Sequence, residues 1–406
     1  MLYLLYTFLL LSRTTEVLVP IPKLMLVLGC LSFLVSFVTG RANGLYARLS
    51  LLMSAWIAIG VLSVPFSMWP TGSIKQLIGW VPNLVVFYAG TQLVTSPQAV
   101  RRVLHVMAAS SVILLAYTLL RGESSVDQRL LLSGSGLVSD PNDLAAALLF
   151  MLPSWLIIFF RSRGLGKLVV GAVAVAILLA VLKTGSRGGL LTLFVLLLFA
   201  LKPLPLQRKV IAVILLAVLA MMGFALLPSS TRLRYATILA PSEMDSGAAD
   251  VVVGAEMSRD IRFEIFKAGV RTTFRHPLGV GIGQIDLGIN EDFEKHGRRA
   301  TWRSPHNTYT QVSGDLGFPG LFVYLAILIT CFRTTGKVLR MTKDQPRLQE
   351  VNRIANCARL SLVSFCISSA FLTHAYLFFV PTLGALCYGL KFWIDTVDKR
   401  SGLMPA

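Results

Sequence analysis

Long continuous runs of apolar residues, separated by short polar connections, dominate the chain. Residues 168–182 and 210–227 lie near or above the ~18 apolar residues that mark a helix crossing a bilayer. A segment in lipid must satisfy its own backbone hydrogen bonds, so only helices and closed barrels can span a membrane. Because these runs are continuous and do not alternate, the pattern predicts an all-α, polytopic membrane helical bundle.

The apolar runs predict about 12 transmembrane helices. Their approximate bounds are 2–20, 22–40, 49–65, 73–95, 103–120, 143–160, 168–182, 189–201, 210–227, 316–332, 360–374 and 376–393. The N-terminal run lacks a small-residue cleavage site and is interrupted by Arg13 and Glu16. It is therefore interpreted as a retained first span or hairpin and not as a removed signal peptide, although residues 1–12 alone are too short to cross.

The same pattern divides the chain into three parts. Residues 1–227 hold about nine spans, 228–315 form a large polar loop, and 316–406 hold the last helices and a tail. Basic residues of short loops collect on the cytoplasmic side of membranes. They collect here in alternate connections, such as those containing Arg101 with Arg102 and Lys202 with Arg208. This distribution predicts that both termini are cytoplasmic and that the large loop lies on the outer face.

Composition supports the membrane assignment and limits the classes of partner that the protein is expected to bind. Only 14% of residues are charged and 55% are hydrophobic, whereas a soluble domain carries roughly 25% charged residues. The net charge of +18 indicates attraction to anionic membrane lipids. Nucleic acid is disfavoured as a partner, because the basic residues are spread over several short loops. The five cysteines include no C-x-x-C pair, which argues against a metal site or a disulfide scaffold.

The large loop contains a predicted amphipathic helix in "RDIRFEIFKAGVRTTFRHPLG" (259–279). Its two stripes at helical spacing are Phe263, Phe266, Val270 and Phe274 on one face, and Lys267, Arg271 and Arg275 on another. Such a helix is expected to lie along the membrane surface with its apolar face down. Residues 228–305 of the loop also hold half of the 20 acidic residues.

Two arginines are candidate anion-binding residues. Arg187 lies in "KTGSRGGLL" (183–191), at the outer junction of two predicted spans, and its guanidinium suits bidentate phosphate contacts. Arg262 lies near the start of the predicted surface helix, where free N–H groups favour anions. Each also has a simpler interpretation. Arg187 would then be a snorkelling residue, and Arg262 would form an exposed salt bridge of little energetic value.

Two glycine- or proline-containing stretches are expected to be turns. In "HPLGVGIGQ" (276–284), Gly279, Gly281 and Gly283 alternate without the flanking strand and helix of a dinucleotide site. This stretch is interpreted as a flexible loop near a substrate, with a simple turn as the alternative. In "GLVSDPNDLAAALL" (136–149), Asp140 is expected to turn the chain, with Asn142 or Asp143 capping the next span.

The stretch "RSPHNTYTQVSGDLG" (303–317) joins the polar loop to an apolar helix. His306 is a proton acceptor near neutral pH, so it is the candidate catalytic residue. Its alternative is an interfacial histidine that contacts headgroups. The other four histidines are expected to be structural. Candidates for orienting the substrate are Arg303, Asn307, Tyr309 and Asp315.

Taken in order, these motifs resemble the O-antigen ligase / O-antigen polymerase superfamily of bacterial membrane glycosyltransferases. The resemblance rests on "DPNDLA", "SRGG", an arginine-led helix in the loop, "PLGVGIG", and "PHNTY" followed by "GDLGFPGL". Asp315 stands where glutamate is commoner in the family. The resemblance implies a GT-C-like helical fold in the inner (cytoplasmic) membrane, with the loop and active site periplasmic.

The resemblance also implies a reaction. Such proteins transfer a glycan from undecaprenyl pyrophosphate, and a ligase passes it to a sugar hydroxyl of lipid A-core. We expect Arg187 and Arg262 to bind the pyrophosphate and His306 to accept the proton of the acceptor hydroxyl. No acidic cluster with metal spacing occurs in the loop, so no metal and no cofactor are expected. The alternatives are an O-antigen polymerase, a protein O-oligosaccharyltransferase and, outside the enzymes, a transporter or flippase of lipid-linked sugars.

Overall fold

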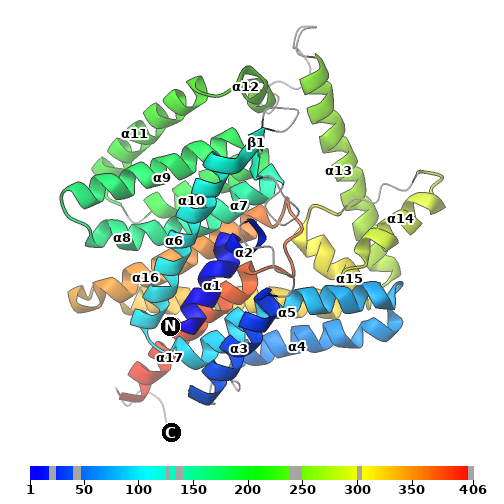
Figure 1. Ribbon diagram of the computed structural model, residues 1–406, viewed down its shortest axis with the longest axis horizontal. Coiled ribbons are helices and arrows are strands. Elements are labelled where there is room, and N and C mark those ends of the chain that lie inside the picture. Colours follow the sequence, from blue (N-terminus) through cyan, green and yellow to red (C-terminus); the bar gives the residue numbers. More distant parts are fainter. Residues whose placement is uncertain are drawn as a thin grey trace.

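The computed structural model describes residues 1–17, 24–39, 47–124, 129–132, 140–202, 204–236, 249–299 and 304–400. Within these ranges the chain is almost entirely helical (Figure 1). One antiparallel hairpin interrupts the helices, formed by β1 (Gly122–Ser124) and β2 (Leu130–Leu132) with Glu123 opposite Leu131. The all-α class predicted from the sequence is confirmed.

The helices fall into three consecutive groups. The first group is α1 (Leu2–Ser12), α2 (Thr14–Val17), α3 (Leu24–Thr39), α4 (Arg48–Leu62), the 3₁₀ turn η2 (Val64–Phe66), α5 (Pro70–Leu93) and α6 (Pro97–Arg121). The second is α7 (Pro141–Met151), η3 (Leu152–Ser154), α8 (Trp155–Arg161), α9 (Leu165–Lys183), α10 (Arg187–Leu201), α11 (Leu206–Ala225) and α12 (Ser229–Ala236). The third is α13 (Ala249–Arg275), α14 (Ile285–Lys295), α15 (Thr308–Met341), η5 (Pro346–Leu348), α16 (Gln349–Ser368) and α17 (Phe379–Arg400).

Each of the twelve expected spans coincides at least in part with one of these helices. In the described ranges, six helical segments are long and apolar enough to cross a membrane, and three shorter ones are also apolar. The six are Arg48–Phe66, Pro97–Leu120, Pro141–Arg161, Leu165–Lys183, Leu206–Ala225 and Thr308–Met341. The chain is therefore membrane-embedded, while twelve crossings remain a prediction.

Helix α11 illustrates why the apolar runs predict lipid contact. Only 6% of its most apolar window is buried inside the protein, and α11 lies at the edge of the bundle beside α9 (Figure 1). In water such an all-round apolar helix would be expected only in a core. Its exposure indicates that lipid covers it.

The expected span 360–374 is wrong at its C-terminal end. Helix α16 ends at Ser368, and residues 369–378 connect it to α17 without helical structure. The backbone of this connection is paired with a distant segment instead. Ser369 accepts a hydrogen bond from the Thr308 N–H at 2.8 Å, and the Leu372 carbonyl accepts one from the Thr308 hydroxyl at 2.7 Å. Apolar composition extends through this turn, so hydropathy alone did not locate the end of the helix.

Helix α13 begins at Ala249, well before the amphipathic stretch expected from the sequence, so the expected position of Arg262 near a helix start is wrong. The helix runs across the direction of α4 and α5 in Figure 1 and packs on α14 and α15. Ile265 and Ala268 are fully buried against the apolar side of α14. The end of α13 is fixed by Asp292, whose carboxylate accepts hydrogen bonds from Arg271 at 2.6 Å and Arg275 at 2.5 Å. Burial acts to raise the pKa of Asp292, but these arginines hold it below its ordinary value.

The glycine-rich turn after α13 is tightly packed. Gly279, Gly281 and Gly283 have φ of 91°, 105° and 73°, in the region that favours glycine. A Cβ on Gly279 would lie 2.3 Å from the Asp315 carbonyl oxygen, and one on Gly281 would lie 2.2 Å from the Ser67 hydroxyl. The turn is thus wedged between α15 and the α4–α5 connection. This close packing does not agree with the flexible loop expected from the sequence, and it favours the alternative of a simple turn.

We expect Gly281→Ala to lower the stability of the protein by at least about 1 kcal/mol, because alanine meets both an unfavourable φ and the Ser67 side chain. Thermal unfolding of the purified protein in detergent measures the loss. Gly297→Ala is the matched control, since Gly297 also has a positive φ of 65° but open space around it. Equal losses in the two variants would contradict the packing argument.

Candidate active-site cavity

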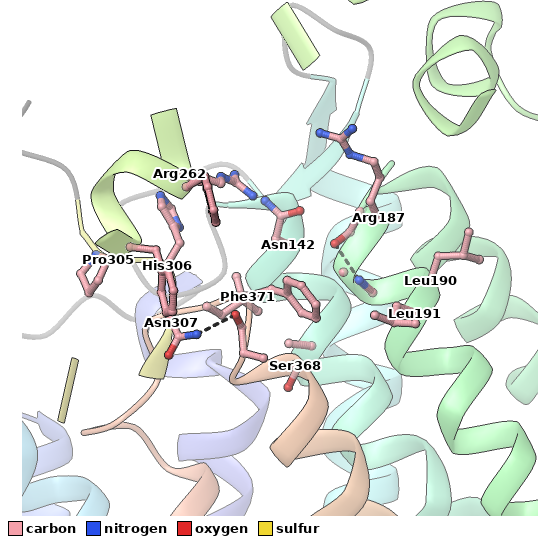
Figure 2. A pocket seen from close by; sticks show the side chains of 18 of the residues that line it. Asn142, Arg187, Leu190, Leu191, Arg262, Pro305, His306, Asn307, Ser368 and Phe371 are labelled. Carbon is pink, nitrogen blue, oxygen red and sulfur yellow. Dashed lines mark hydrogen bonds between the residues drawn. The ribbon is translucent and has the colours of Figure 1, made fainter. Parts of the chain in front are cut away.

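A cavity of about 1110 Å³ lies where five separate segments of the chain meet (Figure 2). Its walls come from the start of α7, the start of α10, one face of α13, and the paired segments 305–307 and 368–372. The lining residues are Asn142, Ala146, Ser186, Arg187, Gly188, Gly189, Leu190, Leu191, Phe194, Arg262, Phe263, Phe266, Pro305, His306, Asn307, Ser368, Ala370, Phe371 and Leu372. The three principal candidates from the sequence, Arg187, Arg262 and His306, therefore share one cavity.

Arg187 reaches the cavity because α10 begins there. Ser186 is the N-cap, and its hydroxyl accepts a hydrogen bond from the Gly189 N–H at 3.1 Å. A Cβ on Gly188 would lie 3.2 Å from Phe371, and one on Gly189 would lie 3.0 Å from Ala145. The two glycines thus allow α10 to approach the neighbouring walls closely and hold Arg187 at the cavity edge.

His306 is held in an unusual backbone conformation. Its φ is 47°, which is uncommon for a residue other than glycine. The His306 N–H donates to the Thr373 hydroxyl at 3.1 Å, and the Asn307 amide donates to the Ala370 carbonyl at 3.1 Å. With the two bonds of Thr308 described above, they bind segment 306–308 to the turn 369–373. Strain of this kind persists where the surroundings over-determine it, and it often marks functional sites.

Apolar side chains form most of the remaining wall. Phe263 and Phe266 enter from the same helix as Arg262, and Leu191 and Phe194 enter from the same helix as Arg187. The apolar stripe of α13 that was expected to rest on the membrane therefore contributes, in part, to the cavity. The cavity combines cationic groups with a large hydrocarbon surface, which suits a charged ligand that carries a lipid.

The other candidates, which were expected to orient the substrate, use their polar atoms in hydrogen bonds within the protein. Asn307 lines the cavity, but its side chain caps α15 by accepting from the Thr310 N–H at 2.9 Å. Tyr309 donates to the Cys366 carbonyl at 2.9 Å, and Asp315 is fully buried and accepts from the Tyr376 hydroxyl at 2.9 Å. Neither Tyr309 nor Asp315 is among the lining residues. These contacts favour structural roles, and Arg303 lies outside the described residues.

Asp315 explains why a carboxylate occurs at this point in the sequence. It accepts hydrogen bonds from the backbone N–H groups of Gln284 and Ile285 at 2.9 and 2.8 Å. It therefore fixes the end of the glycine-rich turn and the start of α14 to α15. Gly279, Gly281 and Gly283 do not line the cavity either. They are linked to it through the packing of their turn against α15.

Sequence reasoning missed two features beside the cavity. Asn142 was interpreted as a possible cap, but the cap of α7 is Asp140, whose carboxylate accepts from the Asn142 N–H at 2.6 Å. His374 was expected to be structural within a span, yet it lies in the turn before α17 and its Nε2 is 2.8 Å from Asp143. Its ring is 1% exposed and stacks on Phe379. No local signal connects residues 231 positions apart.

In the part of the chain that the structure describes, no group of three or more His, Cys, Asp or Glu side chains is placed to hold a metal ion. Metal independence nevertheless stays a prediction.

The fold and the cavity define a helical membrane protein with a cationic, partly apolar site. Residues 172–325 match the family model described as O-antigen ligase, and this match confirms the resemblance to the O-antigen ligase-like superfamily. The family is of the ligase or polymerase type of glycosyltransferase. The matched segment includes Arg187, Arg262 and His306, whereas Asn142 and the turn 369–374 lie outside it. A comparison with curated proteins gives no match.

Proposed function

We propose that the protein is an O-antigen ligase-like glycosyltransferase that moves a glycan from undecaprenyl pyrophosphate to a sugar hydroxyl of lipid A-core. One observation carries the proposal. Arg187, Arg262 and His306 come from three distant parts of the chain and line a single cavity with apolar walls. Cations suit a diphosphate, hydrocarbon suits the lipid that bears it, and an imidazole suits a hydroxyl that must lose its proton.

The proposed reaction is a displacement at the anomeric carbon of the donor sugar. The acceptor oxygen forms the new bond to this carbon, while the bond from the carbon to the diphosphate oxygen breaks. The diphosphate leaves with the electron pair, and His306 takes the proton of the acceptor hydroxyl. Arg187 and Arg262 contact the diphosphate oxygens that gain negative charge, so they stabilise the transition state more than the ground state.

We further propose that the cavity opens on the periplasmic side of the bacterial inner membrane, with both termini cytoplasmic. The alternate basic connections support this orientation. The lipid-linked glycan is presented at that surface, and anionic lipids contact the basic connections on the other.

An O-antigen polymerase and a protein O-oligosaccharyltransferase use the same donor chemistry with a different hydroxyl. They remain the alternatives within the enzyme class. A transporter or flippase of lipid-linked sugars is less well supported. Transport sites typically lie near the bilayer midplane, whereas Arg187 and His306 sit at or just before the first residues of α10 and α15.

Glycolipid profiling of a deletion strain tests the proposal. We expect long glycan polymer to accumulate on the lipid carrier and to disappear from lipid A-core. Single unpolymerised repeats on the core would indicate a polymerase, and loss of glycoprotein alone would indicate the protein-modifying branch. Unchanged glycolipids and glycoproteins would contradict a glycosyltransferase of this kind.

A further inference from the structure

The side chain of Asn142 belongs to the cavity wall and not to the cap of its helix. Asp140 provides the cap of α7, so Asn142 at the second helical position is not needed for that purpose. The residue is only 8% exposed, and it lines the cavity together with Arg187 and Arg262. Figure 2 shows Asn142 between these two arginines.

The neighbours of Asn142 fix which way its amide faces. A carboxylate can only accept hydrogen bonds, and a guanidinium can only donate them. Asp140 lies 2.7 Å from the amide nitrogen Nδ2, and the Nη2 of Arg129 lies 3.1 Å from the amide oxygen Oδ1. The nitrogen must therefore face Asp140 and the oxygen must face Arg129, because the flipped amide would lose both bonds.

Arg129 is itself well anchored. It directly precedes β2, is 9% exposed, and donates from Nε to the Thr184 carbonyl at 2.8 Å. Thr184 lies two residues before the cap of α10, so Arg129 connects the start of α7 to the start of α10. These two helix starts carry Asn142 and Arg187 respectively.

Among the residues that the structure describes, the amide nitrogen of Asn142 donates to Asp140, and its second N–H is left to bind a ligand. An N–H donor in a wall that also presents two guanidinium groups favours an anionic ligand with several acceptor oxygens. We propose that Asn142 is a third binding residue for the diphosphate of the donor, and that Asp140 and Arg129 are positioning residues that orient its amide. This inference rests on the proposed function. It adds a neutral hydrogen-bond donor to the two arginines of the proposed diphosphate site.

The size of the effect follows from the type of bond. A hydrogen bond to a charged group contributes about 1.5–3 kcal/mol, which corresponds to roughly tenfold or more in affinity. Removing the amide should therefore weaken diphosphate binding by about tenfold. Binding of a lipid alcohol without phosphate should not change.

A paired exchange of side chains separates ligand binding from a structural role. In the double variant Asp140→Asn, Asn142→Asp, the oxygen of the amide at 140 still accepts from the N–H of residue 142, and the carboxylate at 142 still accepts from Arg129. Asparagine also caps a helix as well as aspartate does. The cap, the bond from Arg129 and the net charge are thus kept. The bond between the two side chains is lost, because in the wild type it shares Asp140 Oδ1 with the cap, and the donor beside Arg187 and Arg262 becomes a carboxylate.

The experiment measures binding of farnesyl diphosphate and of farnesol to the full chain in detergent, for the wild type, Asn142→Ala and the double variant. We expect affinity for farnesyl diphosphate to fall about tenfold in Asn142→Ala and further in the double variant. Asn83→Ala is the control, because Asn83 is equally buried at 8% and donates to the Tyr376 carbonyl outside the cavity. It should bind farnesyl diphosphate as the wild type does.

The outcomes separate this inference from the proposed function. Wild-type affinity in both Asn142→Ala and the double variant would overturn the role of Asn142, and the proposed function would stand. Failure of the wild type to bind farnesyl diphosphate more tightly than farnesol would overturn the diphosphate site as a whole. If the double variant does not fold, Asn142→Ala decides the matter, with its thermal unfolding temperature showing that the protein is intact.

Discussion

Replacing His306 with alanine should lower glycan transfer about 10²–10⁴-fold, the usual contribution of general acid–base catalysis. The acceptor hydroxyl then loses the group that takes its proton, while the arginines and the apolar walls remain. Transfer from a lipid-linked donor to the acceptor, measured with purified protein, gives the rate. Because the loss concerns the chemical step, donor binding should change little.

Two comparisons make this test specific to the imidazole. His306 has a φ of 47°, which asparagine tolerates better than alanine, so His306→Asn keeps the backbone geometry without the proton acceptor. It should be as inactive as His306→Ala. His296→Ala is the control, because His296 is a half-exposed histidine whose Nδ1 contacts the Asp292 carbonyl at 2.7 Å away from the cavity residues. Normal transfer by His306→Ala at normal abundance would remove His306 from the mechanism.

Substituting either cavity arginine should produce the second large effect. Arg187→Met and Arg262→Met each remove a donor aimed at developing negative charge, and such a removal typically costs about 10²–10³-fold in rate. Lysine keeps the charge but cannot make planar, bidentate contacts. We therefore expect Arg187→Lys and Arg262→Lys to fall between the wild type and the methionine variants.

The measurement for the arginines is the transfer rate together with the affinity for the lipid diphosphate. Arg232→Lys, at an exposed position on α12, serves as the control for a change of arginine to lysine elsewhere. Full activity of both lysine variants would show that bidentate phosphate recognition is not the role of these arginines. Full activity of both methionine variants would exclude a cationic clamp.

The positions of helices could be predicted well from the sequence where the helix surface contacts lipid. The expected span 210–227 corresponds to α11 at Leu206–Ala225, since lipid demands an apolar surface on all sides and leaves a long continuous run. The prediction failed at residues 369–374, where apolar residues leave the helix and pair with segment 306–308. Apolar residues are buried both in lipid and in the protein interior. Hydropathy therefore does not distinguish an apolar turn held by tertiary hydrogen bonds from the end of a span.

The candidate site could be predicted in part, and for a physical reason. Arg187 and His306 lie in recognisable motifs at the boundary between polar and apolar sequence, and Arg262 lies in an amphipathic stretch of the polar loop, so their chemistry is visible without a structure. Asn142 is different. Asp140 and Asp143 stand close to it in the sequence and cap helices equally well. Only the hydrogen bond from the Arg129 guanidinium, just before β2, shows which of these side chains belongs to the cavity wall. Contacts of this kind depend on the tertiary fold.

The bonds between segment 304–308 and the turn 369–374 set a lower limit on the size of an active protein. The side chains proposed to react or to bind the diphosphate in the first instance, Arg187, Arg262 and His306, all occur before residue 325, within the segment that matches the family model. The hydrogen-bond partners of segment 306–308, however, come from the turn between α16 and α17, among them the Thr373 hydroxyl, which accepts from the His306 N–H. A fragment cut after residue 325 would keep Arg187, Arg262 and His306 yet lose the contacts that hold segment 306–308, so we expect a shortened protein with the proposed activity to need α16 and the beginning of α17.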